Sequence, residues 1–170
     1  INVRKKLGTR TIFNLLGPLT NPSKAERQLL GVYEKKWVNI HCEVLKDLGS
    51  KHAMVVHGED GLDEISLSGI TYVSELNNSH ISEYIFDPKD YGYDYINNID
   101  IKGGDAEYNA KQFIIMLNGN DQIFQKIVEL NAGATLYIAG IVNNLNDGFS
   151  LAKNVIDNKI TKNYLENLLK

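Results

Sequence analysis

Two adjacent acidic residues, Asp63 and Glu64, are the side chains of this sequence best suited to hold a metal ion. Neighbours on a regular strand point to opposite faces, so both can reach one ligand only where the backbone is irregular. Gly58 and Gly61 precede the pair and favour such a backbone. Carboxylate oxygens are hard ligands, and Mg²⁺ commonly takes one or two of them together with water and phosphate oxygens. The pattern therefore favours a magnesium site, with a solvated acidic turn as the alternative.

A second stretch with chemical potential covers residues 4–22, RKKLGTRTIFNLLGPLTNP. Arg4 and Arg10 are candidates for anion recognition, because a guanidinium group gives a carboxylate two parallel hydrogen bonds and stays charged at any working pH. The alternative is that both are exposed helix charges, and Arg10 lies beside apolar residues that favour a structural role. The Gly17-Pro18 pair is a turn signal, so a rigid loop is predicted after the apolar run.

The acidic pair is predicted to follow a buried strand. Apolar residues recur at spacings of three and four over residues 36–48, which indicates an amphipathic helix that Gly49 ends. The short apolar run 53–57 comes next and is typical of a strand buried on both faces of an α/β sheet. Asp63 and Glu64 then lie near the carboxyl end of that strand, where open α/β sheets bind their ligands.

The second half of the sequence predicts a hairpin and then helices. Residues 71–75 and 81–86 are interpreted as two strands that turn at Asn77-Asn78, with Pro88 ending the second. From Asp105 onward the pattern is helical, and Asp105 is expected to cap the first helix rather than to support a phosphate site. The predicted helices cover residues 106–117, 121–141 as two helices broken near Gly133, 147–157 and 161–169.

Composition restricts the class of protein. A length of 170 residues suits a single domain, and a hydrophobic content of 43% is enough to bury a core. A formal charge of −3 and a pI near 5.8 argue against a nucleic-acid partner, which normally requires a basic face. No apolar run approaches the ~20 residues that span a bilayer, so no membrane partner is expected. The single cysteine, Cys42, is predicted to be buried, and a reducing cytoplasm is the expected compartment.

Side chains for covalent or zinc chemistry are not apparent in the sequence. The four histidines show no metal-ligand spacing with one another or with Cys42. No nucleophile with a partnered base can be identified either. We therefore assign no catalytic side chain from the sequence.

Four segments together resemble one enzyme family. These segments are RTIFNLLGPLTNP at residues 10–22, GEDGLDEIS at 58–66, GGDAEYNA at 103–110 and NAGATLYIAG at 131–140. They are similar in content and in order to segments of the anthranilate phosphoribosyltransferases of tryptophan biosynthesis, and the likeness runs over nearly all 170 residues. The resemblance implies transfer of the phosphoribosyl group of phosphoribosyl pyrophosphate to anthranilate.

The resemblance also implies a fold. It is the three-layer α/β/α catalytic domain of nucleoside phosphorylases and phosphoribosyltransferases, with a mixed, mostly parallel sheet and a helical C-terminal part. Residues 1–170 would form the C-terminal part of this glycosyltransferase-type α/β domain, as a single domain.

Roles for individual residues follow from the same likeness. Asp63 and Glu64 match the family's acidic pair, which binds Mg²⁺ with phosphoribosyl pyrophosphate. Arg4 matches the arginine that contacts anthranilate, so it is preferred to Arg10. Gly17 matches a glycine whose backbone lines the anthranilate pocket. The implied reaction has no covalent enzyme intermediate, which agrees with the lack of an evident nucleophile.

The chain is expected to be a piece of a longer protein, since Ile1 is not a methionine and lies only a few residues before a motif. Family members carry a small helical domain and a glycine-rich pyrophosphate loop upstream of this point, and they form homodimers. The isolated chain is therefore expected to be inactive. The alternatives are a related pyrimidine nucleoside phosphorylase, a paralogous protein of the same fold, and a folded domain without catalytic activity.

Overall fold

The computed structural model describes residues 12–169. Its elements follow in the order α2 (Ile12–Leu16), η1 (Gly17–Leu19), β1 (Arg27–Gly31), α3 (Trp37–Asp47), β2 (His52–Gly58), β3 (Thr71–Asn77), β4 (His80–Phe86), η2 (Pro88–Tyr91), η3 (Asn98–Ile101), α4 (Ala106–Leu117), α5 (Gln122–Ala139), α6 (Leu145–Asp157) and α7 (Ile160–Leu168), where η marks a 3₁₀ turn.

The four strands form one sheet in the order β1-β2-β3-β4. Strands β1 and β2 are parallel, whereas β2–β3 and β3–β4 are antiparallel. The sheet is mixed, as predicted, but in the described residues it is not mostly parallel. The connections explain this: helix α3 carries the chain from β1 back to the start of β2, while β2, β3 and β4 are joined without a crossover helix.

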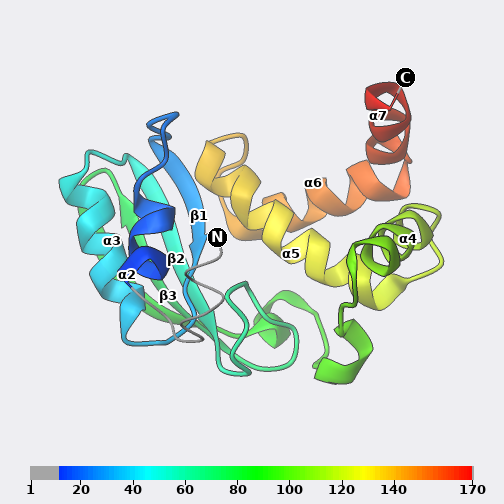
Figure 1. Ribbon diagram of the computed structural model, residues 1–170, viewed down its shortest axis with the longest axis horizontal. Helices are drawn as coiled ribbons and strands as arrows, with labels where there is room; N and C mark the ends of the chain where they lie inside the picture. Colours follow the sequence, from blue (N-terminus) through cyan, green and yellow to red (C-terminus); the bar gives the residue numbers. More distant parts are fainter. Residues whose placement is uncertain (1–11, 170) are drawn as a thin grey trace.

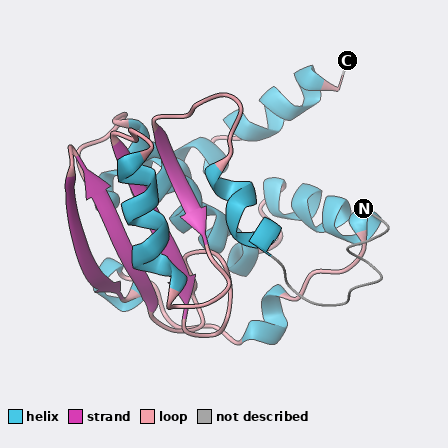
Figure 2. Ribbon diagram, turned by 60° about the vertical axis from the view of Figure 1, so that its left-hand side comes forward, coloured by secondary structure: helices cyan, strands magenta, loops and turns pink. Residues whose placement is uncertain are grey.

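Helices cover both faces of this sheet and make three layers (Figures 1 and 2). Ala53 and Val55 of β2 pack with α3 in one apolar cluster, and Met54 and Val56 pack with α5 in another. Every residue of β2 is buried. The prediction of a strand buried on both faces is therefore confirmed, as is the α/β/α arrangement. Helices α4 and α7 lie beyond α5, away from the sheet (Figure 1), whereas α6 packs along α5 and contacts the sheet through Phe149, which lies against Phe86 of β4.

The predicted hairpin is confirmed as β3 and β4. Asn78 and Ser79 form its turn with φ angles of 47° and 69°, which is the backbone that tight hairpins require. Pro88 begins η2 shortly after β4 ends. Strand β1 was absent from the sequence-based prediction.

Helix α4 has the predicted bounds, and the side chain of Asp105 caps it by accepting a hydrogen bond of 2.8 Å from the Tyr108 N–H. The predicted break near Gly133 is wrong, because α5 runs unbroken from Gln122 to Ala139. Gly133 instead serves packing: a Cβ on it would lie 2.6 Å from the backbone nitrogen of Phe149 in α6. The glycine lets the two helix backbones touch.

Candidate magnesium and substrate site

The acidic pair lies where the two parallel strands end. Asp63 and Glu64 follow the carboxyl end of β2 within residues 59–66, which we call the acidic loop. Gly31, the last residue of β1, lies directly against Asp63: a Cβ on Gly31 would be 1.6 Å from the Asp63 carbonyl oxygen. No side chain fits there. The predicted position at the carboxyl end of the buried strand is confirmed, and Gly31 is a contributor that the sequence analysis missed.

Glycines make the backbone of the acidic loop irregular, as predicted. Gly61 has a φ of +92°, a conformation that favours glycine. The Gly58 N–H donates to the carbonyl of Leu62 at 2.8 Å, and the Gly61 N–H donates to the carbonyl of Gly58 at 2.9 Å. These bonds close a tight turn directly before the acidic pair.

Asp60, a third acid of the loop, has a different role from the pair. Its Oδ1 accepts a hydrogen bond of 3.2 Å from the Leu62 N–H, and its Oδ2 accepts one of 2.6 Å from the Ser66 hydroxyl. Both oxygens of Asp60 thus hold the loop together, so this carboxylate stabilises the turn.

Asp63 and Glu64 are exposed residues. Within residues 12–169, neither takes part in a side-chain hydrogen bond or an ion pair. The pKa of Glu64 is raised, first because surrounding protein removes part of its water and second because the charge of Asp63 is adjacent. Two neighbouring negative charges that have no cationic partner among residues 12–169 can be stabilised by a bound cation.

The far side of the acidic loop is held by α5. The Asn131 Oδ1 accepts a hydrogen bond of 2.9 Å from the Ile65 N–H, and its Nδ2 donates to the Ile65 carbonyl at 3.0 Å. The sequence analysis placed Asn131 in a family segment but gave it no role. The two residues lie 66 positions apart, and no local pattern links them.

The substrate residues expected from the sequence are only partly placed. Arg4 and Arg10 lie outside the described residues. Gly17 begins η1 and is exposed, and a Cβ on it would meet no atom within 4 Å. The turn that follows packs on α3 through Leu19. None of the contacts found in residues 12–169 brings Gly17 together with the acidic loop.

Other metal and membrane sites find no support in the part of the chain that the structure describes. In residues 12–169, no three His, Cys, Asp or Glu side chains are grouped so that they could hold a metal ion. None of the helices described is both long and apolar enough to cross a membrane. Cys42 of α3 is fully buried in the cluster that this helix forms with β2, as predicted.

Comparison with known protein families identifies the family of this domain. Residues 1–160 match the model of the family described as "Glycosyl transferase family, a/b domain". The chain belongs to this family.

Members of the family with known names are similar to almost the whole chain. The anthranilate phosphoribosyltransferase of Laribacter hongkongensis is 46% identical over 167 residues, which are 98% of this chain and 49% of that protein. The crystal structure of the anthranilate phosphoribosyltransferase from Thermus thermophilus superposes with a TM-score of 0.88 at 38% identity, over 98% of this chain and 49% of that one. The resemblance seen in the sequence is thereby confirmed.

A yeast structure adds bound ligands to the comparison. The anthranilate phosphoribosyltransferase from Saccharomyces cerevisiae in complex with PRPP and Mg matches with a TM-score of 0.83 at 25% identity, over 97% of this chain and 48% of that one. In all these cases the glycosyl transferase domain described here spans about half the length of the relatives it matches.

This glycosyl transferase domain also has a buried acid, Glu75, at the end of the sheet opposite the acidic loop. Glu75 of β3 pairs with Met54 near the start of β2 and is only 8% exposed. Its carboxylate accepts hydrogen bonds from the His52 ring at 2.9 Å, the Tyr137 hydroxyl at 2.8 Å and the Tyr84 hydroxyl at 2.8 Å. The pKa of Tyr137 is raised to about 12, first by burial and then by its bond to Glu75.

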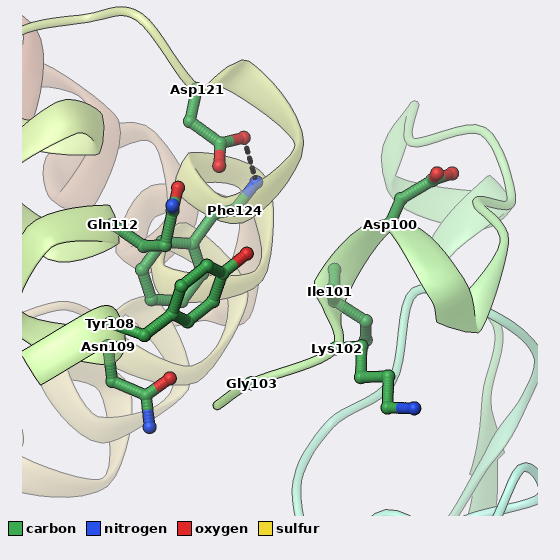
Figure 3. Close-up of a pocket in the computed structure, with 9 residues that line it drawn as sticks. All are labelled: Asp100, Ile101, Lys102, Gly103, Tyr108, Asn109, Gln112, Asp121 and Phe124. Carbon is green, nitrogen blue, oxygen red and sulfur yellow. Dashed lines mark hydrogen bonds between the residues drawn. The ribbon is translucent and has the colours of Figure 1, made fainter. Parts of the chain in front are cut away.

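The domain also has a cavity of about 340 Å³ between η3 and the helices α4 and α5 (Figure 3). Tyr108 and Phe124 lie on one side of it, and Ile101 and Lys102 lie on the other. Asn109, at its rim, holds Gly104 by accepting from the Gly104 N–H at 2.8 Å and donating to the Gly104 carbonyl at 3.1 Å. The cavity shares no lining residue with the acidic loop.

Proposed function

We propose that the protein containing this chain transfers the phosphoribosyl group of phosphoribosyl pyrophosphate to anthranilate, a step of tryptophan biosynthesis in the cytoplasm. The observation that carries the proposal is the acidic pair Asp63 and Glu64. It has no protein partner in the described residues, and contacts from Gly31 and Asn131 hold its backbone at the carboxyl ends of β1 and β2. Kinship with enzymes named anthranilate phosphoribosyltransferase supports the choice of substrates over those of a nucleoside phosphorylase.

The donor set of the acidic pair fits Mg²⁺. Asp63 and Glu64 offer hard oxygen ligands, and two carboxylates are as many as Mg²⁺ commonly takes from a protein. The pKa of Glu64 is raised first by partial loss of water and second by the neighbouring charge of Asp63, and a bound cation would offset both. A bound Mg²⁺ would neutralise charge on the departing pyrophosphate. Because two carboxylates leave most positions around the ion open, phosphate oxygens of the substrate are the natural remaining ligands.

The residues of this chain would act by positioning. Arg4 would hold the anthranilate carboxylate with its planar fork, so that the amine points towards the ribose. Gly17 would line the anthranilate pocket through its backbone, and the open space around it is compatible with a close approach of ligand. Arg10 is the alternative partner for the carboxylate. Correct placement of amine and ribose lowers the barrier without a covalent intermediate.

The assembly of the whole protein is part of the proposal. Residues 1–170 would form the C-terminal part of the glycosyltransferase-type α/β domain, as a single domain, within a homodimeric enzyme. The contact of α5 with both the sheet and α6 supports a single folding unit for the described residues.

The test of this function uses a full-length protein that contains the chain. Combined Asp63→Asn and Glu64→Gln substitutions should remove most turnover at low Mg²⁺, because the neutral amides bind the ion poorly, while the urea unfolding midpoint stays close to that of the parent. Phosphoribosyl anthranilate is followed by its fluorescence across a Mg²⁺ titration. Turnover that does not differ from the parent at any Mg²⁺ concentration would refute the magnesium role.

A second candidate is a folded domain without catalytic activity, and the span of about half the relatives' length favours it for the chain alone. Under this alternative, the purified 170-residue chain folds but forms no product from anthranilate and phosphoribosyl pyrophosphate. Product above that of a matched Asp63→Asn chain would contradict it.

A further inference from the structure

The position of the acidic pair depends on one peptide plane. Ile65 follows Glu64 directly, so the Ile65 N–H belongs to the peptide group that joins the two residues. Because this plane is attached to the Glu64 Cα, its orientation restricts where the Glu64 side chain, next to Asp63, can point. The Ile65 side chain is fully buried in the cluster beneath α5, which places the residue but leaves the direction of its backbone groups to hydrogen bonding.

The amide of Asn131 fixes that direction. It accepts from the Ile65 N–H and donates to the Ile65 carbonyl, as a neighbouring strand would. Its Nδ2 donates a second bond of 3.1 Å to the Ile127 carbonyl one turn earlier in α5. Both amide hydrogens and the oxygen are therefore engaged, and the side chain has a single orientation that satisfies all three contacts.

The acidic pair is thus held from two sides. Gly31 at the end of β1 allows the Asp63 backbone to approach closely, and Asn131 of α5 holds the peptide that follows Glu64. Asp60 closes the turn before the pair. The only one of these contacts supplied by a side chain from outside the acidic loop is that of Asn131.

We propose that Asn131 is a positioning residue for the magnesium-binding carboxylates, which it orients by clamping the backbone of Ile65. The inference rests on the proposed function, since it concerns the same Mg²⁺ site. Residues that orient metal-binding side chains without touching the ion typically change metal affinity or activity by about 10- to 100-fold when they are replaced. Asn131 should therefore act on the affinity for Mg²⁺ more than on the stability of the fold.

The experiment compares two asparagine clamps of the same kind in a full-length protein that contains this chain. Asn131→Ala removes the clamp on Ile65, and Asn109→Ala removes the matching pair of bonds to Gly104 at the start of α4. Binding of magnesium pyrophosphate is measured by calorimetry, alongside the Mg²⁺ concentration that half-saturates turnover. We expect Asn131→Ala to raise the dissociation constant for magnesium pyrophosphate and the half-saturating Mg²⁺ concentration by about tenfold or more. Asn109→Ala should leave both unchanged.

Each outcome separates the two proposals. Equal affinity of Asn131→Ala and the parent for magnesium pyrophosphate overturns the role of Asn131 alone, whereas a parent that binds none overturns the proposed function and this inference together. Should Asn131→Ala fail to fold, Asn131→Asp provides the test, because it keeps the oxygen that accepts from Ile65 and loses both donated bonds. It should bind magnesium pyrophosphate more weakly than the parent, and unchanged binding overturns the proposal.

Discussion

Replacement of Gly31 by alanine should displace the acidic loop and weaken the magnesium site. The new Cβ would lie 1.6 Å from the Asp63 carbonyl oxygen, 2.5 Å from the carbonyl carbon and 3.1 Å from the Asp63 Cβ. Real Cβ atoms stay at least 3.0 Å from such neighbours, so loop and strand must separate by about 1.4 Å. The obstacle is backbone, which cannot rotate away as a side-chain tip can. Asp63 would therefore move from its place at the end of β1.

The size of the effect follows from that displacement. A misplacement of about 1 Å can cost a reaction about 10²-fold, so turnover at limiting Mg²⁺ should fall by about two orders of magnitude. Overpacking of this kind typically destabilises a fold by about 1–3 kcal/mol, which a urea titration resolves. Both quantities should change together, because the same contact sets the loop position and the packing.

The assay is a Mg²⁺ titration of initial rates for a full-length protein with and without Gly31→Ala. Gly69→Ala is the matched control, since its Cβ would meet only the Glu59 side chain, at 3.4 Å from Oε2 and 3.9 Å from Cβ. Such a contact is ordinary, and the flexible Glu59 side chain can move. If Gly31→Ala required the same Mg²⁺ concentration as the parent and unfolded at the same urea concentration, the close contact with Asp63 would have no role in positioning the acids.

Two further predictions concern the charged groups of the site. Because the pKa of Glu64 is raised, the folded chain keeps the Glu64 proton to higher pH than the unfolded chain does. Without metal, the contribution of Glu64 to the free energy of unfolding therefore declines as pH rises from the unfolded pKa through the folded pKa. Glu64→Gln should abolish this decline and unfold at an equal or higher urea concentration than the parent at neutral pH; a lower midpoint would contradict the sign. Arg4→Ala should raise the Michaelis constant for anthranilate by about 10- to 100-fold, the equivalent of about 1.5–3 kcal/mol for a charge-assisted bidentate contact, and Arg4→Lys should recover only part of it. An equal loss for phosphoribosyl pyrophosphate would transfer the role to Arg10.

Much of the fold could be predicted because its signals are local. A strand made of the apolar run 53–57 can be buried on both faces only inside a sheet, and β2 lies there. The hairpin turn and the cap at Asp105 depend on a few neighbouring residues. The cap was predicted correctly, and the turn lies one residue later than predicted, at Asn78 and Ser79. The irregular backbone at Gly61 was also predictable, since glycine tolerates its positive φ.

The features that could not be predicted depend on distant partners. Local preference makes Gly133 a helix breaker, but α5 continues through it. The lack of a side chain at Gly133 lets α6 pack closely against α5. Strand β1 has only five residues and follows a stretch rich in turn signals, so its local sequence does not identify it as a strand. It is recognised by its pairing with β2. The direction of β3 likewise follows from tertiary pairing. The Asn131 clamp joins residues 66 positions apart and leaves no periodic trace in the sequence.

The buried Glu75 shows what would limit an attempt to move the magnesium site elsewhere on this sheet. Three donors from His52, Tyr84 and Tyr137 already occupy its carboxylate, so a cation would have to displace bonds that no water could easily replace. An engineered second site at that end would need at least one of these donors removed, with a loss of stability as the immediate consequence. The acidic loop needs no such exchange with residues 12–169, because Asp63 and Glu64 are exposed and neither takes part in a side-chain hydrogen bond or an ion pair there, so their oxygens are available to a cation.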